Sequence, residues 1–213
     1  MPGQAPYPPC GHPWLERMLH RLTAVPEDLK RGELIAYALL YFVFMLWGIR
    51  LAAYDAMSGE IGGSFMHDID LPFHEFGHVL FRPFGEWLMF MGGSLFQCTL
   101  PLILGGVFLW RERNPFPASM CLWWAGENLL DLAPYIGDAR AMDLPLVGEW
   151  GEEAIELRIL RHDWHNILEP MGMLAWDHRL AALAHTAGTL LMALSWIWGG
   201  WWLWQARKQV ESR

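Results

Sequence analysis

Long uninterrupted apolar runs dominate the pattern of hydrophobic and polar positions along this chain. Residues 180–204 contain no aspartate, glutamate, lysine or arginine, and residues 87–110 are also free of these charged residues. A helix of about 20 apolar residues crosses the hydrocarbon core of a bilayer. Each of the two runs therefore predicts a membrane-spanning helix.

Two further runs extend this pattern. Residues 34–54 are apolar except near their end, where the long side chain of Arg50 can reach the membrane interface. Residues 116–136 form another run, which carries three polar side chains at membrane depth, namely Glu127, Asn128 and Asp131. The pattern predicts an all-α fold, a polytopic membrane helical bundle with about four spans.

A shorter apolar segment covers residues 71–81 and ends at the turn signals of Arg82 and Pro83. It is too short to cross a bilayer unaided, so we expect a short or re-entrant helix. With this arrangement, the basic residues of the N-terminal segment, of the turn after Trp110 and of the C-terminus all fall on one side. This predicts a multi-pass protein of a bacterial inner membrane with both termini cytoplasmic. In a five-span version the turn after Trp110 lies on the far side from the N-terminus.

Composition agrees with a membrane protein, because 54% of the 213 residues are hydrophobic and 14 are tryptophan. The formal net charge of -8 argues against nucleic acid as a partner, since phosphates attract a basic face. The expected partners are the lipid bilayer and a membrane protein or peptide substrate. We expect three regions: an N-terminal tail with an interfacial segment (1–33), a membrane domain with a polar insertion at 139–176 (34–207), and a C-terminal tail (208–213).

The segment 71–81 also carries the clearest chemical signal, an H-E-x-x-H pattern formed by His74, Glu75 and His78. Residues four apart share one face of a helix, so both imidazoles could bind one Zn²⁺. Glu75 would then take a proton from the water on the zinc ion. Histidine and glutamate are costly in apolar surroundings unless paired or liganded, which favours a metal site over a chance match.

A further ligand could come from the run at 116–136 or from the residues just after it. Asp131 and Asp138 lie seven residues apart and would share a face if the helix continued between them. Alternatively, Glu127 and Asp131 pair with arginine or histidine from neighbouring helices.

A second source of ligands is the sequence HDWH at residues 162–165. His162 or His165 could reach the metal if this segment folds against the membrane domain. Asp163 is a weaker candidate, because charged helices on a protein surface are common without a ligand role.

These motifs and their order resemble the site-2 protease family, the intramembrane zinc metalloproteases of the M50 type. The resemblance rests on HEFGH at 74–78 and on ENLLDLAPYIGDAR at 127–140. It implies hydrolysis of peptide bonds in membrane-associated protein substrates, with Glu75 as the general base and Asn128 as a residue that positions the substrate.

In this family an aspartate of the second motif is the third zinc ligand. Counting from Asn128, that position falls on Ile136, and the nearest downstream aspartate is Asp138. The resemblance therefore implies Asp138 as the third ligand, with Asp131 as its substitute and His162 as a further alternative.

Two other functions fit parts of the sequence. A non-catalytic integral membrane subunit could keep the metal site for structure, because a fold does not determine a function. A di-iron membrane oxidase would need many more ligands, and the histidines available for one are His74, His78, His162, His165, His178 and His185. The protease is the interpretation that accounts for the most residues.

Overall fold

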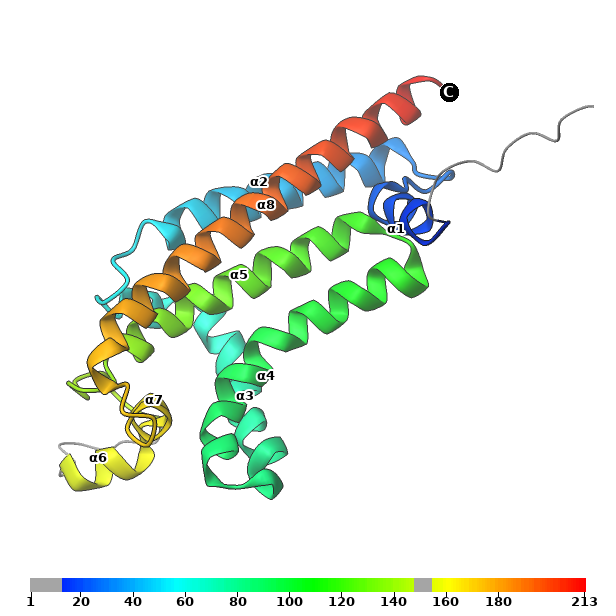
Figure 1. The fold of residues 1–213 in the computed structure, drawn as a ribbon. Helices are drawn as coiled ribbons and strands as arrows, with labels where there is room; N and C mark the ends of the chain where they lie inside the picture. Colours follow the sequence, from blue (N-terminus) through cyan, green and yellow to red (C-terminus); the bar gives the residue numbers. More distant parts are fainter. Residues whose placement is uncertain (1–12, 148–154) are drawn as a thin grey trace, which may run out of the picture.

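The computed structural model describes residues 13–147 and 155–213, and within these two ranges it contains helices and no strand. Three segments are long and apolar enough to cross a membrane: helix α2 (Arg31–Ala52), helix α4 (Glu86–Val107) with the π-helical turn η3 (Phe108–Glu112), and helix α8 (Asp177–Glu211) with the short helix η4 (Leu174–Trp176) before it. Helices α2 and α8 run beside each other, and α4 lies on the far side of α5 (Figure 1). The all-helical class and three apolar helices of membrane length are confirmed, whereas a count of four crossings stays a prediction.

Helix α5 (Pro115–Gly137), which covers the remaining predicted run, is not one of these three, because its polar side chains make it less apolar. It lies between α4 and α8 and is buried along most of its length. Gly126 and Gly188 bring α5 and α8 together, since a Cβ on Gly126 would lie 2.7 Å from the Gly188 carbonyl oxygen. Trp123 and Leu130 of α5 are buried in the apolar core beside these glycines.

Helix α3 (Phe65–Phe81) contains the H-E-x-x-H residues and begins earlier than the predicted segment 71–81. Its N-cap is Ser64, whose hydroxyl accepts a hydrogen bond from the His67 amide at 3.1 Å. The 17 residues of α3 extend over about 25 Å, which is less than the hydrocarbon thickness of a bilayer. The helix is thus at the lower end of the length range for a membrane crossing, and a short or re-entrant helix stays a prediction.

Helices α3 and α4 form a hairpin through the short helix η2 (Arg82–Phe84). The two backbones touch at Gly77 and Gly92, because a Cβ on Gly77 would collide with the Gly92 carbonyl. This close approach holds the face of α3 that carries the histidines against α4.

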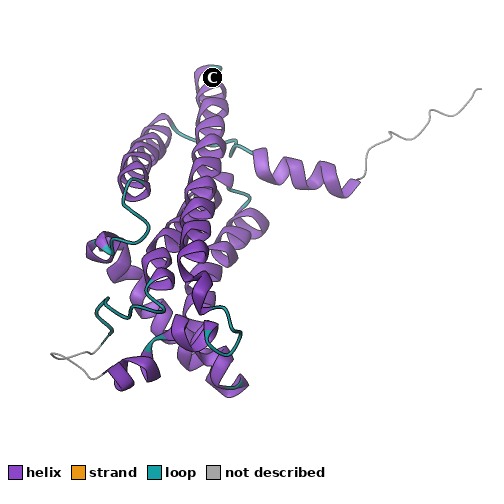
Figure 2. Cartoon of the chain, turned by 60° about the vertical axis from the view of Figure 1, so that its left-hand side comes forward, coloured by secondary structure: helices purple, strands orange, loops and turns teal. Residues whose placement is uncertain are grey.

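Four parts of the chain lie together at one end of the bundle: helix α1 (Pro13–Thr23), the start of α2, the turn between α4 and α5, and the C-terminus (Figure 1). The Arg21 guanidinium donates to the Trp110 carbonyl at 2.8 Å, and the Gln209 amide donates to the Pro26 carbonyl at 2.8 Å. The three basic segments therefore lie at the same end, as the predicted topology requires. Figure 2 shows α1 projecting to the side of the long axis of α8.

The polar insertion contains helix α6 (Ile155–Arg161) and helix α7 (Asp163–Leu168) among its described residues. Ile167 and Leu168 of α7 are buried, and the Trp87 indole of α4 donates to the Ile167 carbonyl at 3.2 Å. A bidentate ion pair between Arg140 and the buried Asp177 links the two ends of the insertion. Residues 1–12 of the predicted N-terminal region 1–33 and residues 148–154 of the insertion lie outside the described residues.

Candidate metal centre

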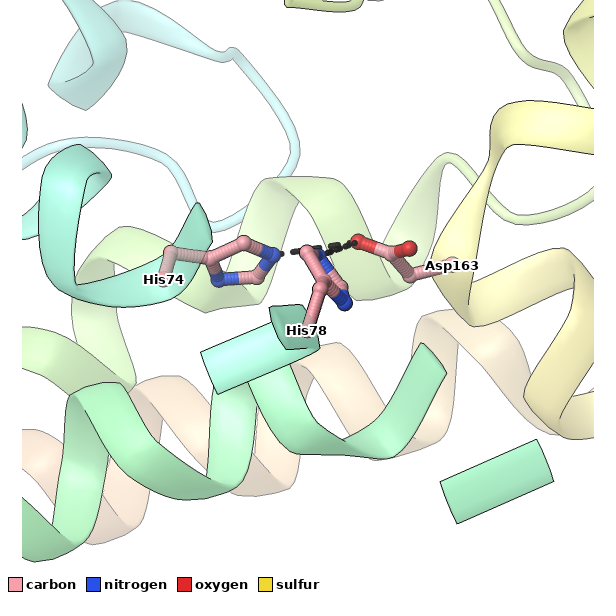
Figure 3. A group of neighbouring side chains, drawn as sticks. All are labelled: His74, His78 and Asp163. Atoms are coloured by element: carbon pink, nitrogen blue, oxygen red, sulfur yellow. Dashed lines mark hydrogen bonds and ion pairs between the residues drawn. The ribbon is translucent and has the colours of Figure 1, made fainter. Parts of the chain in front are cut away.

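Helix α3 presents His74 and His78 side by side, and helix α7 brings Asp163 to them (Figure 3). The Nε2 atoms of His74 and His78 lie 3.0 and 3.3 Å from the same carboxylate oxygen, Oδ2 of Asp163. The three atoms that could bind a metal ion, one from each residue, lie within 4.8 Å of one another. These three residues can therefore hold a metal ion, as the H-E-x-x-H pattern predicts for the two histidines.

The hydrogen bonds on the far side of each ring determine which nitrogen carries the proton. Nδ1 of His78 lies 2.8 Å from the Met89 carbonyl oxygen, which can only accept a hydrogen bond. Nδ1 of His78 is therefore a donor, and Nε2, which faces Asp163, is the nitrogen available to a metal ion.

The same reasoning fixes His74 through two steps. The Gln97 side-chain nitrogen donates to Asp131 at 3.0 Å, which leaves the Gln97 oxygen facing Nδ1 of His74 at 2.9 Å. That oxygen only accepts, so Nδ1 of His74 donates and Nε2, which faces Asp163, is the nitrogen available to a metal ion.

These assignments make the group fit a cation. One nitrogen of each imidazole and one carboxylate oxygen converge, and a ring nitrogen that carries no proton can give its lone pair to a cation. Nitrogen and oxygen ligands of this kind suit a divalent transition metal. Histidines that bind metals commonly donate their other N–H to a carbonyl or amide oxygen, as His74 and His78 do here.

Asp163 is held in place by Tyr135 of α5. The Tyr135 hydroxyl donates to Oδ2 of Asp163 at 3.2 Å and accepts from the Asp163 amide at 3.0 Å. Burial alone would raise the pKa of Asp163, but the contacts with His74 and His78 outweigh burial and hold that pKa below its ordinary value. The carboxylate is thus ionised, as a metal ligand must be.

Gly93 of α4 leaves the space that the two rings occupy. A Cβ at this position would lie 2.5 Å from Nε2 of His74 and 2.6 Å from Cε1 of His78. The backbone of α4 therefore forms one wall of the metal centre.

The structure does not bring Asp138 into the group, although the family pattern implied it as the third ligand. Helix α5 ends at Gly137, and the Asp138 carboxylate instead accepts from the amides of Asp143 and Leu144 at 2.8 and 3.1 Å. Burial alone would raise the pKa of Asp138, but hydrogen bonds from His162 and these amides lower the pKa below its ordinary value. Asp138 thus stabilises the loop that follows α5.

The two alternative ligands are also engaged elsewhere. His162 accepts from the His165 amide through Nδ1 at 3.3 Å, so Nε2 carries the proton and donates to Asp138 at 3.3 Å. Asp131 accepts from Gln97 and lies 2.8 Å from Nδ1 of His67, so it acts on the metal centre only through Gln97.

Sequence reasoning missed Gln97, whose signal was a lone amide in an apolar run without charged residues.

A cavity of about 680 Å³ opens beside the metal centre. Its lining includes all three residues of the group, Glu75 of the motif, and apolar residues from the loop after α5 such as Leu146. Asn128 is fully buried and donates to the Gln97 carbonyl at 3.1 Å, and it is not part of the cavity wall. The predicted contact of Asn128 with a substrate therefore has no counterpart in this geometry.

No protein-family model, no curated protein and no solved structure matches this chain. The candidate metal centre is therefore described by its own geometry: two imidazoles and one carboxylate that converge, with a glutamate lining the same cavity.

Proposed function

We propose that this chain is a multi-pass membrane zinc metalloprotease, which hydrolyses peptide bonds in membrane-associated protein substrates. The observation that carries the proposal is the convergence of His74, His78 and Asp163 on one point of a cavity that Glu75 also lines. An open site of this kind suits hydrolysis better than a purely structural role.

In the proposed topology α2, α4, α5 and α8 cross the membrane, and α3 is re-entrant. Helix α5 would be an inner span, because its polar side chains are buried against α3 and α4: Asp131 contacts His67 and Gln97, and Asn128 donates to the Gln97 carbonyl. The basic segments gather at the end that holds α1 and the C-terminus, which supports cytoplasmic termini in a bacterial inner membrane.

Zinc is the proposed metal because two histidines and one carboxylate form a common catalytic zinc set. When bound, zinc would polarise the scissile carbonyl and lower the pKa of the attacking water. Glu75 follows His74 directly on α3, lines the cavity, and would accept the proton of that water before passing it to the leaving amine.

The number of protein ligands separates a catalytic site from a structural one. Structural zinc sites are closed by four protein ligands, whereas catalytic sites have three and leave a position for water. Within the described residues the group has three ligands. His162 is not a fourth ligand, because both of its ring nitrogens form hydrogen bonds with other residues. This count supports catalysis over the non-catalytic subunit.

The same group argues against the di-iron oxidase. Such a site needs a second set of histidines or carboxylates around a second ion. Among the described residues, only one group has three or more ligands close enough together for an ion.

The resemblance to the site-2 protease family supports the proposal only for the H-E-x-x-H helix. In this chain the third ligand would come from α7, after the second motif, rather than from the motif itself. The proposed protease is thus a divergent arrangement in which a polar insertion completes the metal centre.

The decisive experiment compares Glu75→Gln with Glu86→Gln, a control at the exposed start of α4. Protein purified without chelators is assayed for zinc by mass spectrometry and for cleavage of fluorescently labelled casein and of a synthetic single-span peptide. We expect Glu75→Gln to keep its zinc and to lose cleavage by at least about 100-fold, whereas Glu86→Gln keeps both. Unchanged cleavage in Glu75→Gln, or wild-type protein without metal, would contradict the proposal.

A further inference from the structure

A second cluster of charged side chains lies at the end of the bundle where α1 meets the turn between α4 and α5. It lines an open cavity of about 520 Å³ and consists of Glu16, Arg17, His20, Arg21 and Arg113. Three arginines face one glutamate, so the cavity is positively charged although the whole chain is acidic. An excess of guanidinium groups in a hollow favours an anion with several oxygen atoms.

Arg21 is fixed in this cavity by contacts with the end of the π-helical turn. Its guanidinium donates to the carbonyls of Leu109 and Trp110 at 3.2 and 2.8 Å. The guanidinium carbon also lies 4.2 Å from the centre of the exposed Trp110 ring. Arg21 therefore anchors α1 to the end of the apolar segment 86–112 and sets the position of the cavity.

Arg113 adopts a backbone conformation that residues with side chains rarely take. It has φ 51° and ψ 34°, in the left-handed region, immediately after the π-helical turn Phe108–Glu112. Strained residues and π-helical turns both concentrate at functional positions. Glycine would adopt this conformation without strain, so the arginine at this position points to a use for its charge.

Helix α1 combines this basic face with an apolar one. Its exposed apolar side chains are 40% to 57% accessible and lie on one side of the helix: Trp14, Leu15, Met18 and Leu19. The helix projects to the side of the bundle axis (Figure 2) and packs at the end of an apolar helix of membrane length. An amphipathic helix with arginine on its polar face and tryptophan on its apolar face is typical of the membrane interface.

We propose that this cavity binds the phosphate of an anionic phospholipid, with the apolar face of α1 inserted among the acyl chains. Arg17 and Arg113 would contact the phosphate oxygens, while Arg21 keeps its contacts with the turn. The lipid, rather than a soluble phosphate, is the proposed occupant because the exposed apolar face adjoins the charged cavity. The site is separate from the metal centre, so it does not depend on the proposed hydrolysis.

The test uses the full-length protein in neutral detergent, with native mass spectrometry to measure the affinity for phosphatidylglycerol and for phosphatidylcholine. The main variant is Arg113→Gly, which removes the charge and the backbone strain together and so should preserve the fold. The control is Arg207→Gln near the same end, where the arginine forms an exposed pair with Glu211 among the described residues. Inorganic phosphate is added in a parallel arm.

We expect the wild-type protein and Arg207→Gln to bind phosphatidylglycerol more tightly than phosphatidylcholine. Arg113→Gly should lose about tenfold in phosphatidylglycerol affinity, and Arg17→Gln should lose a similar amount. Millimolar inorganic phosphate should not displace the lipid. Equal affinity for the two lipids, an unchanged affinity in Arg113→Gly, or displacement by inorganic phosphate would overturn the proposal.

Discussion

At the scale of single residues, the metal centre depends on hydrogen bonds between the histidine ligands and residues that do not contact the metal. Gln97 connects His74 to Asp131, and its side-chain oxygen accepts from Nδ1 of His74, so that Nε2 faces the metal centre. The Met89 carbonyl does the same for His78. A metal site assembled in this way is sensitive to residues that never touch the ion.

Replacing Gln97 by leucine should weaken zinc binding without removing a ligand. The substitution keeps a similar volume but frees the His74 ring to rotate and to change its tautomer. We expect zinc affinity to fall by about 10- to 100-fold, measured by competition with a chromophoric chelator. Thr99→Val on the same helix, where the hydroxyl bonds only within α4, is the control. Equal affinities for Gln97→Leu and wild type would contradict this role of Gln97.

The role of Asp138 as a loop-stabilising residue predicts a dependence of stability on pH. Its pKa is lowered in the folded protein from an ordinary value of 3.8, so its stabilising contribution is complete above that pH. The contribution is then lost as the pH falls through the folded-state pKa. Asp138→Asn should therefore be less stable than wild type at neutral pH, and the gap in thermal unfolding temperature should close in acid. A gap that stays constant with pH would contradict this assignment.

At the scale of helices, small residues let α3 and α4 approach closely enough to position the ligands. Gly77 and Gly92 bring the backbones together, and Gly93 leaves room for the two imidazole rings. Contacts of this kind between membrane helices rely on close packing of backbones. The hairpin is therefore a rigid support for two of the three ligands.

Gly93→Ala tests this support directly. The new methyl group would lie 2.5 Å from Nε2 of His74, so the ring must move and the metal should be lost. Gly106→Ala on the same helix is the matched control, because a Cβ there meets nothing within 4 Å and alanine favours the helix. We expect zinc content near zero in Gly93→Ala and unchanged in Gly106→Ala. Equal zinc contents in the two variants would show that α4 does not shape the site.

The apolar pattern predicted the positions of α2, α4 and α8, because membrane helices must be apolar over a fixed length, and it also located the helix α5. The pattern also located His74 and His78, since their spacing is a local property of one helix. The pattern did not identify Asp163 as a ligand, because this residue lies 89 positions from His74 and reaches it only through the packing of α7 on α4. Such tertiary contacts leave no periodic signal in the chain.

At the scale of the whole molecule, the bundle has two chemically different ends. The basic segments, α1 and the C-terminus gather at one end, where Arg21 and Gln209 tie them together. The loop that contains Ser58 joins α2 to α3 at the other end of α2. A bilayer would separate these ends if α2, α4, α5 and α8 cross and α3 does not.

Cysteine labelling tests this topology. In a background without the native cysteines, Ser58→Cys, Arg111→Cys and Ser212→Cys are exposed to a membrane-impermeable maleimide in intact spheroplasts and in inverted vesicles. We expect positions 111 and 212 to react only from the cytoplasmic side and position 58 only from the outside. Labelling of position 111 from the outside would favour the five-span version, in which α3 crosses the membrane.

The most direct measurement of the central claim is the zinc-to-protein ratio of two variants purified in parallel, Asp163→Ala and Asp138→Ala. If His74, His78 and Asp163 form the metal centre, the wild type and Asp138→Ala should contain about one zinc per chain, and Asp163→Ala should contain almost none. Loss of zinc in Asp138→Ala together with full zinc in Asp163→Ala would contradict the account and restore the ligand implied by the family pattern.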